Sequence, residues 1–175
     1  LSSDMRQEWQ GSVRWTLAAL DGRVLAEGEE AAAVRPSGVT RVAEFDFSPF
    51  LDLDTRRDLV FVVELWPADP QGTASPLALQ TAFFVPTKHL SLVDPRIDAQ
   101  VTLQDGLLAI DLSARSLARL VEISLAGADV VFSDNYFDLP AHRTIRVTAT
   151  LPAGWDLATA RSALRVRSVY DTFTH

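Results

Sequence analysis

The chain has 175 residues, of which 47% are hydrophobic, and its formal charge is −7. This content is enough for a sizeable core and excludes disorder, and the length fits one large domain or two modules of about 85 residues each. Arginines scattered among acidic residues form no basic stripe, so we expect no nucleic-acid partner, and the acidic balance disfavours an anionic membrane.

The chain contains no cysteine, which excludes a disulfide framework, a thiolate metal site and a cysteine nucleophile. The longest apolar runs, such as residues 59–63, are far shorter than a membrane span, and no basic region followed by an apolar segment opens the chain. We therefore expect no membrane partner and a soluble piece of a longer protein, with a cytoplasmic location as the working assignment.

The first predicted strand covers residues 11–20, where apolar and polar side chains alternate with the period of two of a half-buried strand. The dipeptide Asp21-Gly22 follows and precedes the apolar run 24–26. Asp-Gly between two apolar runs favours a tight hairpin turn, which needs positive φ at both positions. We predict that the chain opens with a β-hairpin.

Two further strands, 31–34 and 39–47, are predicted on either side of a turn. In the second of them, Phe45 and Phe47 point to the same face. The run 59–66 is apolar enough to be a central strand that is buried on both faces. A break at 67–72 and a strand over 77–85 complete this half of the chain.

Residues 87–95 show no periodic pattern, and the alternation typical of strands resumes after them. Alternating residues at 97–103, the turn at 104–106 and the run 107–112 predict a second hairpin. The segment 119–125 fits a helical stripe as well as a strand, and we interpret it as a strand. The remaining predicted elements are strands over 130–132, 144–150 and 163–170 and a short helical turn over 155–160.

Many short strands at intervals of roughly 8 to 12 residues are typical of antiparallel sandwiches, and no helix longer than about ten residues is predicted. We therefore predict an all-β fold of two immunoglobulin-like antiparallel β-sandwiches in tandem. The expected domains are residues 1–87 and 88–175.

Residues 130–140 are an apolar run that ends abruptly in turn-forming side chains. Asp134 and Asn135 can hydrogen-bond the nearby backbone and tolerate left-handed dihedrals, while Phe137 and Leu139 can anchor such a turn to a core. We interpret the stretch as a buried structural corner, because it contains no His, Cys or Lys that could serve as a catalytic partner.

No motif of a catalytic or metal site is found. The three histidines are far apart and lack the spacing of a zinc helix, and the acidic side chains around Asp129 and Asp138 lack the Gly and Glu of a calcium loop. Chance carboxylate pairs are unavoidable among 23 acidic residues, and no nucleophile elbow or glycine-rich phosphate loop occurs. We expect no catalytic residue, no metal and no cofactor.

The four tryptophans support an alternative function, a carbohydrate-binding module. Trp15 and Trp66 fall in apolar strand phases and are predicted to be core residues. Trp9 and Trp155 lie in connecting segments, where an exposed indole could stack on a sugar ring. Trp9 and Trp155 are therefore the candidate substrate-binding residues, although a tryptophan more commonly closes the end of a sandwich core.

The stretch Phe132–Pro140, followed by Thr144–Val147, resembles a motif in the last domain of beta-mannosidases of glycoside hydrolase family 2, which reads Ser-Asp-Asn-Tyr-Phe-Asp-Leu, then Pro-Gly and a strand. Residues 84–95 are similar to the crossing between the last two domains of that family, and Trp15 with the following Asp-Gly is similar to the opening of the penultimate one. This sequence has Ala141-His142 where Gly-Glu is usual. The motif residues are Phe132, Asp134, Asn135, Tyr136, Phe137, Asp138 and Leu139.

The resemblance implies the non-catalytic C-terminal two-sandwich region of a beta-mannosidase-like hydrolase. In that family the catalytic acid and nucleophile are glutamates on a barrel domain that precedes the sandwiches. The resemblance thus implies a barrel in the same parent chain as the partner, and release of terminal beta-mannose as the parent's activity. Related enzymes of this architecture act on other sugars, so the parent's substrate stays open.

Overall fold

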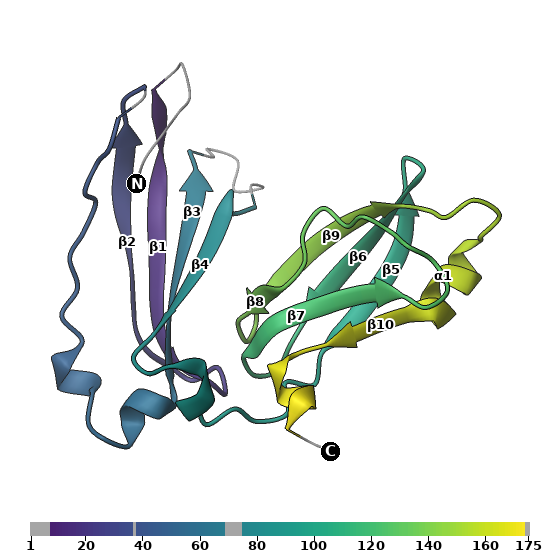
Figure 1. The fold of residues 1–175 in the computed structure, drawn as a ribbon. Helices are drawn as coiled ribbons and strands as arrows, with labels where there is room; N and C mark the ends of the chain where they lie inside the picture. Colours follow the sequence, from purple (N-terminus) through teal and green to yellow (C-terminus); the bar gives the residue numbers. More distant parts are fainter. Residues whose placement is uncertain (1–7, 37, 69–74, 174–175) are drawn as a thin grey trace. The chain divides into compact units, whose positions relative to one another are not determined.

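The computed structural model describes residues 8–36, 38–68 and 75–173 (Figure 1). The chain divides into two compact units. The first contains residues up to Ser91 except for Leu20–Gly22, and the second contains Leu20–Gly22 and the residues from Leu92 onward. Strands dominate both units.

The first unit contains a four-stranded antiparallel sheet with the strand order β2-β1-β3-β4 (Figure 1). β1 and β2 form the predicted hairpin, and β3 is the internal strand that the apolar run indicates. In the turn only Gly22 has positive φ, at 93°, so the loop is not the primed type that Asp-Gly predicts. The strands are β1 (Trp9–Ala19), β2 (Val24–Val34), β3 (Leu59–Pro67) and β4 (Ala78–Phe83).

A cluster of aromatic rings packs against one face of this sheet. The stacked rings of Phe45 and Phe47 lie 5.8 Å apart, and Phe47 lies 4.8 Å from Phe61 on β3. The predicted strand 39–47 is wrong, because residues 40–47 form no strand and Val39 makes only an isolated bridge. Its two phenylalanines do share a face as predicted, because an extended backbone points alternate side chains the same way whether or not it pairs with a strand.

Short 3-10 turns connect the parts of the first unit. They are η1 (Ser48–Phe50), η2 (Thr55–Arg57) and η3 (Thr87–His89). In η1, Phe50 packs beside Leu51 and Phe84 onto the buried side chains of Leu17 and Leu59. The predicted break at 67–72 lies largely outside the described residues.

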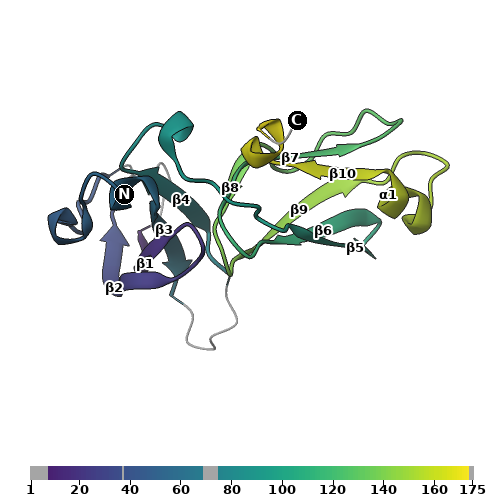
Figure 2. The ribbon, with the colours of Figure 1, turned by 90° about the horizontal axis from the view of Figure 1, so that it is seen from below.

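The second unit contains two three-stranded antiparallel sheets, with the orders β10-β7-β8 and β5-β6-β9 (Figure 2). The predicted hairpin is formed by β5 and β6. Its turn residues Asp105 and Gly106 have φ of 51° and 81°, as a primed two-residue turn requires. The strands are β5 (Asp98–Gln104), β6 (Leu107–Ser113), β7 (Ala118–Leu125), β8 (Phe137–Leu139), β9 (Thr144–Thr150) and β10 (Leu164–Arg167).

The core of the second unit lies between these sheets. Leu108, Ile110 and Leu112 project from β6 and are 0% exposed, as are Val121 on β7 and Val147 on β9. Burying each such side chain contributes about 1.5–3 kcal/mol. The segment that fitted both helix and strand forms β7, because its alternate residues supply this core.

Two strand predictions in the second unit need correction. The segment 130–132 is not a strand and contributes only an isolated bridge between Phe132 and Ala149. The final predicted strand is shortened to β10, because α1 (Leu157–Ala163) precedes it and η4 (Val169–Thr172) follows it. The predicted helical turn became α1, which the Asp156 side chain caps by accepting a hydrogen bond from Thr159 N at 2.7 Å.

Candidate functional site

The two tryptophans predicted to bind sugar are both half-buried. Trp9 begins β1. A Cβ added at Gly11 would lie 2.6 Å from the Trp9 ring, so the indole lies across this glycine. Trp155 lies before α1 and packs against the core of the second unit. Neither indole is a freely exposed platform, and sugar binding by these two residues stays a prediction.

The corner that follows residue 132 is fastened to β7 by the side chain of Asn135. Its Oδ1 accepts from Ile123 N at 2.8 Å, and its Nδ2 donates to Ile123 O at 2.9 Å. Next to it, Tyr136 N donates to Val121 O at 2.8 Å. Because a side-chain amide offers the same donor and acceptor as a peptide unit, Asn135 extends the pairing of β7 beyond the end of β8.

The other motif residues also have partners within the second unit. Asp138 forms an ion pair with Arg119, and their side chains are only 11% and 16% exposed. Asp138 Oδ1 also accepts from Leu120 N at 3.0 Å. Phe137 packs against the core and Leu139 is 0% exposed. Each of these contacts holds the corner in place, and the structural role of the motif stays a prediction.

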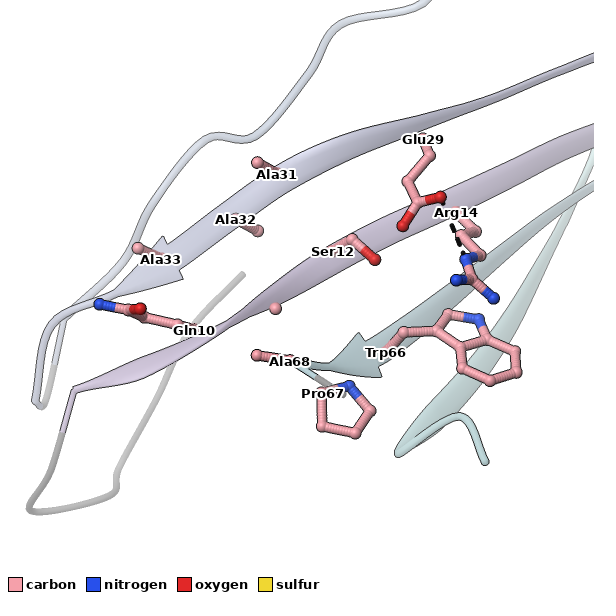
Figure 3. Close-up of a pocket in the computed structure, with 11 residues that line it drawn as sticks. Gln10, Ser12, Arg14, Glu29, Ala31, Ala32, Ala33, Trp66, Pro67 and Ala68 are labelled. Atoms are coloured by element: carbon pink, nitrogen blue, oxygen red, sulfur yellow. Dashed lines mark ion pairs between the residues drawn. The ribbon is translucent and has the colours of Figure 1, made fainter. Parts of the chain in front are cut away.

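A groove of about 580 Å³ lies on the first unit, on one face of β1, β2 and β3 (Figure 3). Residues directly opposite on paired antiparallel strands share a face. Ser12 on β1 is opposite Ala31 on β2 and Trp66 on β3, and Gln10 is opposite Ala33. Small side chains on β2 and at Ser12 therefore form the floor, and the Trp66 ring stands beside them.

The charged residues Arg14 and Glu29 close one end of this groove (Figure 3). Arg14 Nε lies 3.3 Å from Glu29 Oε2, and the two side chains are 46% and 51% exposed. The Arg14 guanidinium also lies 4.2 Å from the centroid of the Trp66 ring, within cation–π range. Hydrogen bonds from the Ser12 hydroxyl, and then from Arg14, hold the pKa of Glu29 below its usual value.

Sequence reasoning missed Trp66, which was predicted to be a core residue. It is half-buried and lines the groove. Its Nε1 atom is buried, and no described group accepts a hydrogen bond from it. The sequence shows that polar residues alternate along β1. Only the register of β1 with β3 places Ser12 and Trp66 together.

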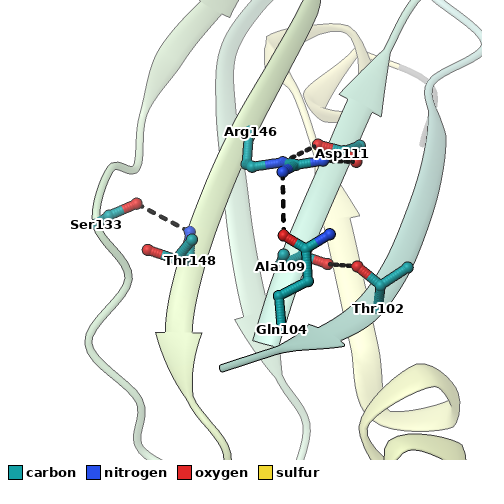
Figure 4. A network of polar contacts seen from close by, with 7 residues as sticks. All are labelled: Thr102, Gln104, Ala109, Asp111, Ser133, Arg146 and Thr148. Carbon is teal, nitrogen blue, oxygen red and sulfur yellow. Dashed lines mark hydrogen bonds and ion pairs between the residues drawn. The ribbon is translucent and has the colours of Figure 1, made fainter. Parts of the chain in front are cut away.

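A second polar cluster lies on the sheet β5-β6-β9 of the second unit (Figure 4). Arg146 binds Asp111 through two hydrogen bonds of 2.7 Å and donates to Gln104 at 3.1 Å. The Arg146 guanidinium holds the pKa of Asp111 below its usual value. Beside it, Thr148 N donates to Ser133 Oγ at 2.9 Å. This cluster ties the strands β5, β6 and β9 together.

Within the described part of the chain, no three His, Asp or Glu side chains are arranged to hold a metal ion. Among residues 8–36, 38–68 and 75–173, no helix has both the length and the apolar character that crossing a bilayer requires.

The comparisons with known proteins give the family. Residues 1–89 match the model of the mannosidase Ig/CBM-like domain, and residues 92–172 match the model of the Ig-fold domain named for mannosidases. The beta-D-mannosidase from Dictyoglomus thermophilum has a similar structure, with a TM-score of 0.78 and 16% identity over 94% of this chain and 19% of that one. No curated protein sequence matches this one.

The class of protein is thus an all-β tandem of immunoglobulin-like sandwiches, which confirms the predicted fold class. The chain belongs to the mannosidase Ig/CBM-like domain family and represents C-terminal sandwich domains of a mannosidase, as the sequence resemblance implied.

Proposed function

We propose that this chain is the C-terminal region of a beta-mannosidase of glycoside hydrolase family 2 and supports a catalytic barrel in the same parent chain. In this proposal the barrel hydrolyses terminal beta-mannosides. The observation that carries the proposal is the order of the two family matches, a mannosidase Ig/CBM-like domain followed directly by the Ig-fold domain.

The state of the acidic residues supports an accessory role. A glycosidase needs two carboxyl groups across a cleft, one of which acts as an acid with a raised pKa. Among the described residues, every carboxyl group whose pKa is displaced has its pKa lowered by hydrogen bonds from neighbouring side chains or backbone. These groups are Glu29, Asp46, Asp52, Asp111 and Asp156. Such groups stay ionised and are poor general acids at neutral pH.

Two measurements test this proposal. The purified chain should not hydrolyse an aryl beta-mannoside above the buffer rate, and turnover would contradict the accessory role. The coding sequence upstream of Leu1 should encode a barrel with two catalytic glutamates, and the longer protein that includes it should release mannose from the same substrate. A barrel that prefers another sugar would overturn the mannoside assignment and leave the accessory role intact.

The proposed location is the cytoplasm. Fractionation of the source cells with an antibody against the chain tests this, and recovery in the membrane or secreted fraction would contradict it.

A further inference from the structure

We propose that the groove on β1, β2 and β3 of the first unit binds a neutral oligosaccharide, with one sugar unit at the Arg14–Glu29 pair and its neighbour over the alanine floor. This goes beyond the proposed function, because a supporting domain needs no ligand of its own. It also replaces Trp9 and Trp155 by Trp66 as the aromatic contact.

The shape of the groove results from side-chain size in successive rows of the sheet. One row combines Ala31, Ser12 and Trp66, and the next places Ala33 beside Gln10. Two alanines and a serine leave space above the sheet, and the indole and Pro67 form a side wall. The resulting volume of about 580 Å³ lies within the range of roughly 300–1,000 Å³ that is usual for small-molecule sites.

The chemistry of the lining suits hydroxyl groups. The Glu29 carboxylate accepts hydrogen bonds, the Arg14 guanidinium donates them, and the Gln10 amide does both. A sugar hydroxyl is both donor and acceptor, so it can bridge a neighbouring carboxylate and guanidinium. The lowered pKa of Glu29 means that the carboxylate remains an acceptor at neutral pH.

The charge balance of the groove selects against anions. Arg14 faces Glu29 on β2 at 3.3 Å and is in register with Glu64 on β3. One cation between two acidic side chains leaves no net positive charge for a phosphate or a carboxylate ligand. The binding of a neutral sugar does not require a net positive charge.

The indole of Trp66 offers a further donor. Its Nε1 is buried and has no acceptor among the described residues, while the Arg14 guanidinium covers the ring. Because an exposed ion pair is weak, the Arg14 side chain can shift off the ring and still lie beside Glu29. A ligand hydroxyl can then accept from Nε1, and the uncovered ring can pack against the apolar face of the sugar.

The test is an NMR titration of the 175-residue chain with linear beta-1,4-linked mannotriose and, separately, cellotriose. We expect saturable shift changes, for at least one of the two sugars, at the backbone amides of residues 10–14 and 31–33 and at the Trp66 indole N–H. Absence of saturable changes with both sugars, or changes confined to Trp9 and Trp155, would overturn the proposal.

Variants on β2 provide a matched pair. Glu29→Gln should weaken binding about tenfold, as expected for loss of one charge-assisted hydrogen bond. Glu30→Gln should leave the affinity unchanged, because Glu30 is equally exposed but opposite Val13, on the other face of the sheet. Trp66→Phe keeps a ring and removes the donor, and it should also weaken binding. Equal effects of Glu29→Gln and Glu30→Gln would contradict the site. Because no catalysis is measured, this outcome is independent of the mannosidase assignment.

Discussion

The core of the second unit is built from aliphatic side chains on two facing sheets, with Leu108, Ile110 and Leu112 of β6 at its centre. In the first unit, the described residues form a four-stranded sheet, which is covered by aromatic rings that come largely from segments outside this sheet, such as Phe45 and Phe47. Aromatic side chains bury roughly 150–250 Å² each. A few of them can therefore cover much of one face of a sheet.

The two units also differ in how the backbone around the core is hydrogen-bonded. In the second unit, strand ladders satisfy the backbone on both sides of the core. In the first unit, the covering segment depends on local turns, such as the hydrogen bonds from Ser48 N and Ser48 Oγ to Asp46 Oδ1. We expect the second unit to depend on its aliphatic centre and the first to depend on a few rings.

The largest effect is expected for Ile110→Ala. Ile110 is 0% exposed on the central strand of its sheet, so the cavity should cost about 2–5 kcal/mol. NMR signals of each unit, followed through a urea titration, give a midpoint for each. The midpoint of the second unit should fall, whereas Leu103→Ala, at a side chain that is 47% exposed, should change it little. Equal midpoints for these two variants would show that the aliphatic centre is not critical.

A smaller loss, about 2–4 kcal/mol, is expected for Phe47→Ala, because the ring is only half-buried. Phe47 contacts the rings of Trp15, Phe45, Phe61 and Phe84, so its removal should loosen the whole layer. The same titration should show a lower midpoint for the first unit. Val39→Ala, at a side chain that is 84% exposed, is the control, and a similar shift in both variants would contradict the aromatic layer.

For Asn135→Ala we expect a loss of about 1–3 kcal/mol, because two backbone groups of Ile123 lose their partner together. This exceeds the single hydrogen bond of about 1 kcal/mol that a simple turn residue would contribute. Asp134→Ala removes only a contact with the adjacent Asn135 N and should have less than half this effect. If Asp134→Ala lowered the stability more than Asn135→Ala, the proposal that Asn135 extends the pairing of β7 would be wrong.

The smallest effect concerns pH. The pKa of Asp111 is lowered by Arg146, so the ion pair stabilises the fold above the usual Asp pKa, and this stabilisation is lost as the pH falls through the lowered value. Asp111→Asn should cost about 0.5–1 kcal/mol at neutral pH. The difference in stability between this variant and the parent should vanish once the pH lies below the lowered pKa of Asp111. Asp98→Asn, at an exposed position on β5, is the control. If the difference in stability persisted in acid, the loss in Asp111→Asn would result from packing and not from charge.

The sequence predicted the strands of the second unit more accurately than those of the first. The reason is the difference between their cores. Alternation together with Asp105-Gly106 identified β5 and β6, and alternation alone gave β9 with its observed bounds. In both cases the polar phase faces solvent and the apolar phase faces the opposite sheet. At 40–47 the same alternation comes from a segment that forms no strand and packs its rings on a sheet, and periodicity cannot distinguish the two cases.

The groove could not have been predicted, because it depends on register. Trp66 lies in an apolar run, and nothing in that run indicates that it pairs with Ser12, a polar position on β1. Arg14 and Glu29 are likewise neighbours only because the hairpin aligns them. The corner was predicted as a structural feature from Asp134 and Asn135, but the attachment of Asn135 to Ile123 needed the three-dimensional structure.

The outer strand of the first unit has a consequence for self-association. Among the described strands, β2 has a neighbour on one side only, and it carries Glu27, Glu29 and Glu30 within four residues. Exposed strand edges invite pairing with another copy, and clustered like charges oppose such pairing. Since the pKa of Glu29 is lowered, this edge keeps part of its charge in mild acid. We therefore expect the carboxylate that closes the groove also to disfavour pairing of this edge with a second copy.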